Sequence, residues 1–229
     1  MREDSLLLFS ENELQIAALV FMVAVYALKI RWILKFPAGR DRQAPTGRPG
    51  TSGPKGARHS LLQIAMPWAM DSTRQHPLLY AQFVVFHIGV AASITMSFLI
   101  PYAPGTIAGR TAVIVFRVIF GAAFFVGVAR LFRRIRDPYI RSISTPDDYF
   151  SLALLIVWLA LSFLAAPNRP QASEWPLLSY FLLTAFFLVY VPFSKISHYL
   201  YYPFARWYLG RTLGHRGVYP LKRGLEIRT

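Results

Sequence analysis

The sequence of 229 residues contains no cysteine. Without thiols the chain can form no disulfide bond, perform no thiolate chemistry and hold no iron–sulfur cluster through cysteine ligands. Acidic residues are also scarce: 11 Asp and Glu stand against 25 Lys and Arg, which gives a formal net charge of +14. The sequence has neither a repeat with a period of roughly 20 to 50 residues nor an inverted pair of interrupted helices, which disfavours repeat architectures and many transporter folds.

Apolar residues, in contrast, are abundant. The chain is 55% hydrophobic and 15% aromatic, and its mean hydropathy is +0.38, which exceeds what a soluble domain of this length normally has. The apolar residues run continuously and do not alternate with polar ones, a pattern that favours helices over strands. A membrane-spanning helix needs about 20 apolar residues. We therefore predict an all-α integral membrane protein, a bundle of five transmembrane helices at residues 14–36, 76–102, 111–132, 149–166 and 176–209.

Basic residues indicate the orientation of this bundle, because short loops rich in Lys and Arg stay on the cytoplasmic side. One set of connecting segments contains only Arg2, Arg110 and Arg169, and Arg117 falls inside a span, so the other set contains 21 of the 25 Lys and Arg. The acidic N-terminus, residues 1–13, is therefore predicted to lie outside and the tail, residues 210–229, in the cytoplasm. An acidic stretch before the first span argues against a cleavable signal peptide, so we expect a multi-pass protein of the cytoplasmic (inner) membrane.

Residues 37–58, PAGRDRQAPTGRPGTSGPKGAR, consist mainly of Pro, Gly and basic residues. Such a composition buries no core, so residues 37–75 are predicted to form an extended cytoplasmic loop. Within it, residues 60–70 (SLLQIAMPWAM) are apolar but only half a membrane long, which suits an interfacial helix or a docking surface for a partner protein. The basic residues here and in the loop at residues 133–148 favour contact with anionic lipid, and no nucleic-acid-binding fold accompanies them.

Two of the five histidines lie within or beside predicted spans: His87 in FVVFHIGV and His198 in PFSKISHYLYYPF. An ionisable side chain inside a bilayer is costly and usually functional, although a neutral imidazole bonded to a neighbouring helix is the structural alternative. His87 lies eleven residues after the start of its span at His76, which is roughly 16 Å along a helix. If the last span continues to Leu209 and stops at Gly210, His198 lies eleven residues before that end, at nearly the same height.

Two imidazoles at equal depth on antiparallel helices can bind one metal from opposite sides. In a membrane bundle the commonest such arrangement is bis-histidine ligation of a b-type haem. We therefore predict that His87 and His198 ligate haem iron, with Pro192 bending the last helix toward its partner. The other three histidines, His59, His76 and His215, fall in polar flanking sequence and are predicted to be solvated. Alternatively, His76 and His215 could form a second pair.

Three segments resemble the cytochrome b (gamma) subunits of respiratory nitrate reductase and the related membrane cytochromes of sulfite-reductase-associated and heterodisulfide-reductase-like complexes. They are FHIG at residues 86–89, PFSKISH at residues 192–198 with Pro203 after it, and RRIRDPYIRSISTPDD at residues 133–148. The resemblance covers most of the chain, from the first span to about Arg211. It implies a five-helix bundle that holds haem b and exchanges electrons with quinol. His87 then corresponds to the second-helix ligand, and His198 to the fifth-helix ligand, of the haem nearer the cytoplasm.

Members of that family carry a second haem nearer the outer face, and Ser97 and Tyr180 occupy the positions of its ligands here. Neither side chain is a credible haem ligand, so we expect a single haem. Arg117 lies at the height of the missing haem, roughly 10 Å inside the third span, and no Asp or Glu falls inside a predicted span to neutralise it. It either snorkels outward or bonds a carbonyl, or it serves a ligand such as a quinone carbonyl, a haem propionate or a partner's carboxylate. With Arg110, these residues form our candidate quinone site.

On the inner side, the arginines of residues 133–148 mostly set the topology, and Arg141 is our candidate for neutralising a haem propionate. The predicted function is an electron-transfer subunit of a respiratory oxidoreductase complex, in which haem b relays electrons between quinone and a cytoplasmic iron–sulfur partner. That partner must be another chain, because cysteine is absent here, and it is expected to contact residues 60–70 and the tail after Arg206. The alternatives are a haem-free membrane anchor of such a complex and a small transporter, the latter disfavoured because no acidic residue lies in a predicted span.

Overall fold

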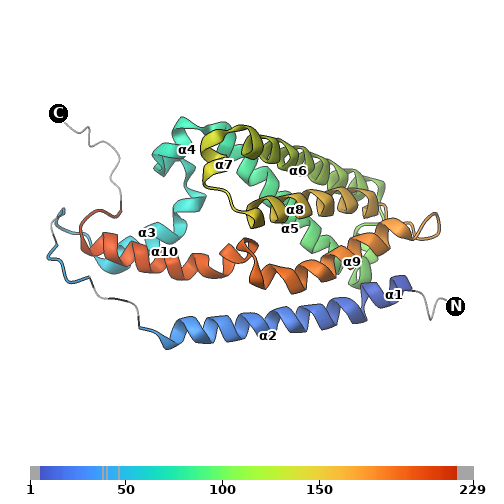
Figure 1. Cartoon of the computed structure of the whole chain (residues 1–229), viewed down its shortest axis with the longest axis horizontal. Coiled ribbons are helices and arrows are strands. Elements are labelled where there is room, and N and C mark those ends of the chain that lie inside the picture. The colour runs from blue at the N-terminus through green and yellow to red at the C-terminus, as the bar shows by residue number, and fades with distance from the viewer. Residues whose placement is uncertain (1–5, 38, 40, 46, 221–229) are drawn as a thin grey trace. The chain divides into compact units, whose positions relative to one another are not determined.

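The computed structural model describes residues 6–37, 39, 41–45 and 47–220 (Figure 1). All regular secondary structure in this part of the chain is helical, and five of its helices are long and apolar enough to cross a membrane. These candidate spans are Leu6–Lys35, Pro77–Tyr102, Arg110–Arg136, Pro146–Ala165 and Trp175–Phe193. The predicted all-α class and the presence of five helices able to span a membrane are thus confirmed, while the orientation of the two termini stays a prediction.

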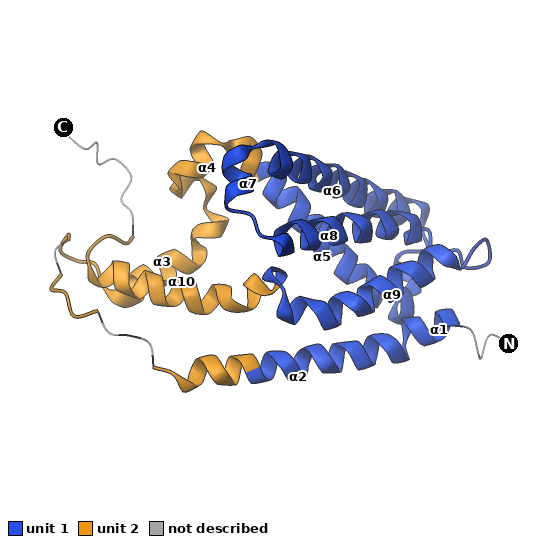
Figure 2. Ribbon diagram, in the orientation of Figure 1, with its two compact units in different colours: residues 1–28, 81–196 blue, residues 29–80, 197–229 orange. Residues whose placement is uncertain are grey.

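The chain divides into two compact units, each described by itself (Figure 2). Unit 1 comprises Met1–Leu28 and Ala81–Ile196, and unit 2 comprises Lys29–Tyr80 and Ser197–Thr229. The helices of unit 1 are α1 (Leu6–Glu11), most of α2 (Glu13–Lys35) and α5 (Pro77–Tyr102), η3 (Pro104–Thr106), α6 (Arg110–Arg136), α7 (Pro138–Ser142), α8 (Pro146–Ala165), α9 (Trp175–Tyr190), η4 (Val191–Phe193) and the start of η5 (Lys195–Ser197). Those that lie wholly in unit 2 are α3 (Gly53–Leu62), η1 (Gln63–Ala65), η2 (Pro67–Ala69), α4 (Asp71–Gln75) and α10 (His198–His215).

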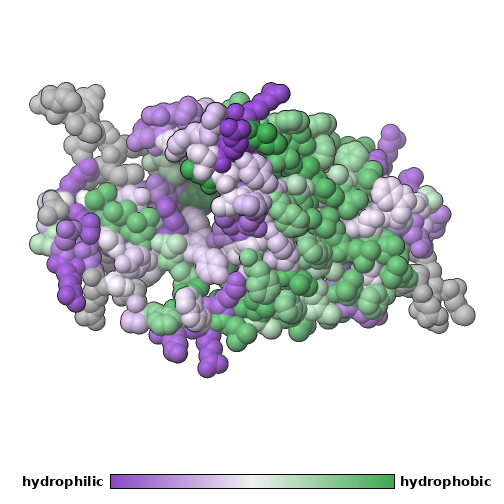
Figure 3. All heavy atoms as spheres, in the orientation of Figure 1, coloured by the Kyte–Doolittle hydropathy of each residue, from purple (hydrophilic) through white to green (hydrophobic). Residues whose placement is uncertain are grey.

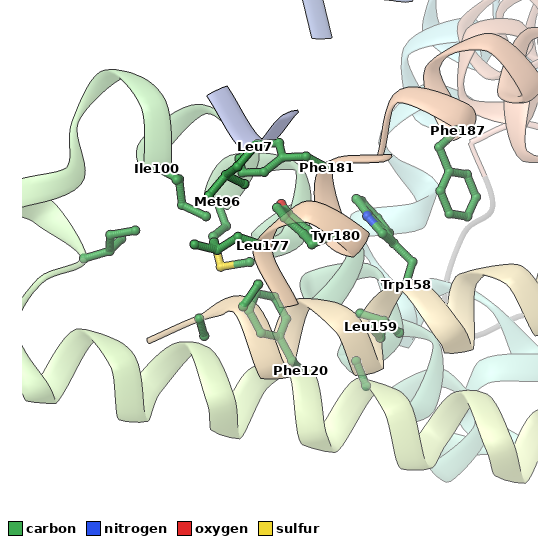
Figure 4. Packing of buried hydrophobic residues seen from close by; sticks show 14 of the residues in the cluster. Leu7, Met96, Ile100, Phe120, Trp158, Leu159, Leu177, Tyr180, Phe181 and Phe187 are labelled. Atoms are coloured by element: carbon green, nitrogen blue, oxygen red, sulfur yellow. The ribbon is translucent and has the colours of Figure 1, made fainter. Parts of the chain in front are cut away.

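Large apolar side chains from five helices form the core of unit 1 (Figure 4). Tyr180 and Phe181 of α9 are fully buried, and the Tyr180 ring stacks on Trp158 of α8 with the ring centroids 6.3 Å apart. Phe120 of α6 and Met96 of α5 complete the centre of the cluster. Apolar helices gain little by leaving lipid, so close packing of this kind is what holds such a bundle together.

The outer surface of unit 1 is apolar as well, as expected of side chains that face lipid. Figure 3 shows hydrophobic residues over much of the face that this unit presents. Val118 and Phe125 of α6, for example, are 64% and 71% exposed. A soluble domain rarely exposes so much contiguous apolar surface.

Unit 2 corrects the prediction that residues 37–75 form an extended loop without a core. Within this segment, Gly53–Leu62 form the helix α3, which packs along α10. Gly56, Ala57 and Ser60 of α3 are buried. Small residues allow the two backbones to approach closely: a Cβ atom added at Gly210 would lie 2.6 Å from the Cα atom of Ala57. Gly56, one of the glycines in the segment predicted as loop, is therefore a packing position. A contact with a distant helix cannot be inferred from the local composition.

Other helix ends also differ from their predictions. The first span begins at Leu6, not at residue 14, because α1 runs almost directly into α2. The apolar stretch at residues 60–70 does not form one helix; α3 ends at Leu62, and the short 3₁₀ turns η1 and η2 follow on either side of Met66, which precedes Pro67. The fourth span begins at Pro146 and not at residue 149, so two aspartates lie in its first turn: Asp147 and Asp148.

The last predicted helix, residues 176–209, is interrupted. Helix α9 ends at Tyr190, η4 and η5 follow, and α10 begins at His198 and continues past Gly210 to His215. Pro192 has no N–H for a helical hydrogen bond, and Ser194 adopts an extended backbone, so the α-helix cannot continue through this segment. Gly210 is not a helix end, because it packs against α3. The equal heights of His87 and His198 were inferred by counting back from a helix end at Leu209. Because α10 continues to His215, that count no longer supports equal heights.

Candidate functional site

His87 lies on α5 within unit 1, and its ring is exposed at the surface of the isolated chain. Its Nδ1 atom is 2.7 Å from the carbonyl oxygen of Phe83, one helical turn earlier. A carbonyl oxygen can only accept, so Nδ1 must carry the hydrogen and donate it. In a neutral imidazole this assigns the lone pair to Nε2, which points away from the backbone. A hydrogen bond of this kind typically orients a histidine that ligates a metal through its other nitrogen.

The neighbours of His87 in the FHIG segment pack against α6. The side chain of Phe86 is buried, and a Cβ atom added at Gly127 would lie 3.0 Å from its ring. Gly89 is buried where α5 approaches Ala123, and a larger residue there would clash with that alanine. Residues 86 and 89 share one side of a helix, whereas residue 87 lies about 100° further round. The segment therefore fixes α5 through Phe86 and Gly89 and leaves His87 on a different face.

His198 is the first residue of α10 and belongs to unit 2. Its ring is exposed at the surface of the isolated chain and meets the ring of Tyr199 edge-on, with the centroids 6.4 Å apart. His87 and His198 thus lie in different units, and their joint ligation of one iron stays a prediction.

Asp147 of α8 holds the interruption that precedes His198, entirely within unit 1. Its Oδ1 accepts hydrogen bonds from the hydroxyls of Tyr190, at 2.6 Å, and Ser151, at 3.2 Å. Its Oδ2 accepts one from the backbone N–H of Lys195 at 3.1 Å. Tyr190 is the last residue of α9 and Lys195 the first of η5. One carboxylate therefore bonds groups on both sides of the break, and it accepts from a backbone N–H that has no helical partner there.

Asp148 makes a second set of contacts beside the first. Its Oδ2 accepts from the Lys195 ammonium at 2.7 Å and from the backbone N–H of Thr145 at 2.7 Å, the latter as in a capping box. The ammonium also donates to the Thr145 hydroxyl at 2.8 Å. Two of the segments that carry the family resemblance, residues 133–148 and 192–198, are therefore joined by an ion pair. The sequence prediction assigned no role to these aspartates, although the T-P-D-D pattern is a recognisable helix start.

The chemistry of the available donors limits which metal centres are possible. Among the described residues, no group of three or more His, Cys, Asp and Glu side chains could hold a metal ion. A zinc site needs at least three protein ligands. A haem needs only one or two, because the porphyrin supplies four nitrogens. A two-histidine donor set thus fits a haem and does not fit a metal ion bound by side chains alone.

The structure brings Ser97 and Tyr180, two of the residues predicted around the quinone site, close together. Tyr180 is fully buried, and its hydroxyl donates to the carbonyl oxygen of Ser93 at 2.6 Å. The Ser97 hydroxyl donates to the carbonyl oxygen of Ile94 at 2.7 Å on its own helix. Arg117 lines a pocket to which neither Ser97 nor Tyr180 contributes, and Arg110 is exposed at the start of α6 outside that pocket. Two of the four candidate quinone residues, Ser97 and Tyr180, are therefore neighbours in unit 1, whereas Arg117 lines the pocket and Arg110 lies outside it.

Arg141, the candidate for neutralising a propionate, is exposed on the short helix α7. A second cation, not singled out from the sequence, lies beside the FHIG segment: the guanidinium carbon of Arg130 is 5.8 Å from the centre of the Phe86 ring. Arg130 therefore lies at the face of α5 that carries Phe86, and His87 lies about 100° further round that helix. The place of Arg130 at the start of the basic run RLFRRIR could have drawn attention to it.

The three remaining histidines have different surroundings. His76 is exposed at the end of α4, and Nε2 of His215, also exposed, donates to the carbonyl oxygen of Gln43 at 3.0 Å. His59 differs from its prediction as a solvated residue, because its Nε2 atom is buried and has no hydrogen-bond partner among the described residues. Its position on α3, which the sequence prediction treated as loop, explains the difference.

No model of a known protein family matches the chain. Over 188 residues it is 28% identical to a protein of Nitratidesulfovibrio vulgaris (strain Hildenborough), and the alignment covers 77% of this chain and 76% of that one. That protein carries the name "Protein", which states no activity. This similarity therefore assigns no function to the chain.

Proposed function

We propose that this chain is the membrane cytochrome b subunit of a respiratory oxidoreductase complex, in which a single bis-histidine haem b relays electrons between the quinone pool and a cytoplasmic iron–sulfur partner. The observation that carries the proposal is the hydrogen bond from Nδ1 of His87 to the carbonyl oxygen of Phe83. It presents Nε2 as the ligating atom of an imidazole on an apolar, membrane-spanning helix. Haem, when bound, would supply the one-electron chemistry, and the chain would supply ligation and position.

His198 is the proposed second ligand, and its surroundings support that role. The interruption before it is held by two backbone groups: the N–H of Lys195 donates to Asp147, and the N–H of Ile196, two residues before the histidine, donates to the Ser194 hydroxyl. A ligand at the start of a helix, after a segment held by several hydrogen bonds, loses little conformational freedom when it binds. The sequence resemblance assigns the same residue to the haem nearer the cytoplasm.

One haem per chain, and not two, is supported by the packing around Tyr180. This residue stands where the resemblance would require a ligand for an outer haem, and it is enclosed by Trp158, Phe181 and Thr184 in the core of unit 1. Side chains of this size fill the interior to the density of an organic crystal. A macrocycle at this position would have to displace them.

An absorption spectrum and a pyridine haemochrome assay of the purified full-length chain test the proposal. We expect a reduced b-type band and one haem per chain. Replacing either proposed ligand, in His87→Ala or His198→Ala, should abolish the band, because the haem would then lose one of the two side chains that would hold it. His76→Ala and His215→Ala serve as matched controls and should keep the spectrum of the unmodified chain.

A chain that assembles in the membrane but binds no haem would contradict this proposal and favour the alternative, a haem-free anchor of a complex. Two haems per chain would contradict the single-haem reading. The partner follows from the composition: a chain without cysteine holds no Cys-ligated cluster, so electrons from the haem must pass to another subunit. Co-purification of a cysteine-rich iron–sulfur protein after gentle solubilisation checks this part.

A further inference from the structure

A pocket of about 330 Å³ opens in unit 1 beside the loop that joins α8 to α9. Two arginines line it, Arg117 from α6 and Arg169 from the loop. Its other lining residues are mostly apolar, among them Ala165 and Leu177, which are buried in the core. The loop is held by backbone hydrogen bonds from Asn168 to Ala165 and from Ala172 to Arg169, at 2.9 and 3.1 Å. The pocket is thus built from three helices, α6, α8 and α9, and a structured turn.

Arg117 is oriented by Phe163 of α8. Its Nε atom donates to the carbonyl oxygen of Phe163 at 3.3 Å, and its guanidinium carbon lies 5.0 Å from the centre of the Phe163 ring. This bond uses one of the five N–H donors of the guanidinium group. The geometry therefore holds the charged end of a partly buried side chain in place while most of its donors stay available to a ligand.

The charge of this pocket is uncompensated by its own lining. No Asp or Glu lines the pocket. The acidic residue of the loop, Glu174, is not among the lining residues. Two arginines that line one cavity repel each other, and an arginine does not lose its proton at physiological pH. A neutral ligand leaves this repulsion in place, whereas an anion relieves it and can accept hydrogen bonds from both groups.

The surface around the pocket indicates what kind of anion would bind. Leu164, which lines the pocket, is 40% exposed, and Ile114 and Val118, which flank Arg117 on α6, are 51% and 64% exposed on a membrane-spanning helix. A ligand with an anionic head and long apolar chains would satisfy the arginines and cover this surface at once. A small soluble anion would satisfy only the arginines.

We propose that the pocket lined by Arg117 and Arg169 binds the phosphate of an anionic phospholipid, whose acyl chains lie along α6 in the adjoining leaflet. The proposal gives Arg117 an occupant different from the quinone expected from the sequence. It does not depend on haem, so it can fail or hold independently of the proposed electron-transfer role.

Native mass spectrometry of the detergent-solubilised full-length chain tests this inference, with phosphatidylglycerol and phosphatidylcholine added in turn. We expect phosphatidylglycerol to bind in preference to phosphatidylcholine. Arg169→Gln should weaken phosphatidylglycerol binding on the order of tenfold, as expected for the loss of a hydrogen bond to a charged group. Arg117→Leu should weaken binding to the same extent. Because Arg169 lies in a loop and Arg117 in a helix, agreement between the two variants shows that the loss does not come from misfolding of α6. Arg110→Gln, which removes a charge at the same end of unit 1 but outside the pocket, should leave binding unchanged.

Three results would overturn the proposal. Equal binding of both lipids would remove the role of the negative charge. Displacement of phosphatidylglycerol by millimolar inorganic phosphate, with equal thermal protection by phosphate alone, would identify a site for the free anion. Binding of a short-chain quinone that is lost in Arg117→Leu, while phosphatidylglycerol binding is retained, would return the pocket to the quinone.

Discussion

His59 illustrates at the scale of one residue how burial changes the chemistry of a side chain. Its ring lies edge-on to Tyr219, with centroids 5.1 Å apart, and its Nε2 atom is buried without a hydrogen-bond partner among the residues that the structure describes. Burial, together with the positive charge of nearby Arg206, lowers the pKa of His59 below its ordinary value of 6.5. Both effects disfavour the charged imidazolium in the folded state.

The pKa of His59 predicts how the stability of unit 2 depends on pH. Because the unfolded chain binds a proton near pH 6.5 and the folded chain only at lower pH, folding is favoured above pH 6.5 and loses stability as the pH falls below it. Hydrogen exchange of the α3 amides, corrected for intrinsic rates, should therefore accelerate between pH 7.5 and 5.5. His59→Phe should remove this dependence, while His76→Phe, at an exposed position, should keep it. A profile unchanged by His59→Phe would refute the assignment.

At the scale of secondary structure elements, the interruption between α9 and α10 shows what the sequence could and could not predict. Pro192 predicted a bend, because proline lacks the N–H that a helix needs. The partners that stabilise the bend come from α8. Lys195 bonds Asp147 and Asp148, which lie more than 40 positions earlier in the chain. Such pairs follow from the folded structure and leave no local pattern. The same reason explains why α3, rich in glycine and proline, was predicted as loop although it packs along α10.

A double-mutant cycle tests the ion pair that joins α8 to the interrupted segment. The Lys195 and Asp148 side chains are 54% and 17% exposed, so solvent screens their attraction and the coupling should be about 0.5 to 1 kcal/mol. We expect Lys195→Met and Asp148→Asn to lower the free energy of unfolding in mixed micelles by less together than the sum of their separate effects. As a control, Lys195→Met combined with Asp137→Asn should be additive, since Asp137 caps α7 through the N–H groups of Tyr139 and Ile140. Additivity in both pairs would exclude the interaction.

At the scale of the whole molecule, the five spans were predictable because length and hydropathy are properties of each segment alone. The predicted spans at residues 76–102 and 111–132 fall within or close to the bounds of α5 and α6. The candidate site was less predictable, because it depends on which faces meet. FHIG drew attention to His87, yet the roles of Phe86 and Gly89 at the contact with α6 became apparent only from the folded unit.

The orientation in the membrane is a prediction about the whole chain, and the absence of cysteine makes it directly testable. Because 21 of the 25 Lys and Arg fall on one side of the predicted spans, that side should be cytoplasmic. Single cysteines can be placed at two exposed positions, Gly105 after α5, where an added Cβ atom meets nothing within 4 Å, and Ala44 in the basic segment before α3. In intact cells a membrane-impermeant maleimide should label Gly105→Cys and should reach Ala44→Cys only after the membrane is permeabilised.

The unmodified chain is the control for this labelling, since it has no thiol to react. The reverse pattern, with Ala44→Cys labelled in intact cells and Gly105→Cys protected, would invert the topology. It would also place residues 60–70 and the tail after Arg206 on the side away from any cytoplasmic iron–sulfur partner. The proposed electron transfer would need the segments expected to contact such a partner on the cytoplasmic side. Labelling at these two positions therefore tests whether the basic segments face the side on which the iron–sulfur partner is proposed to bind.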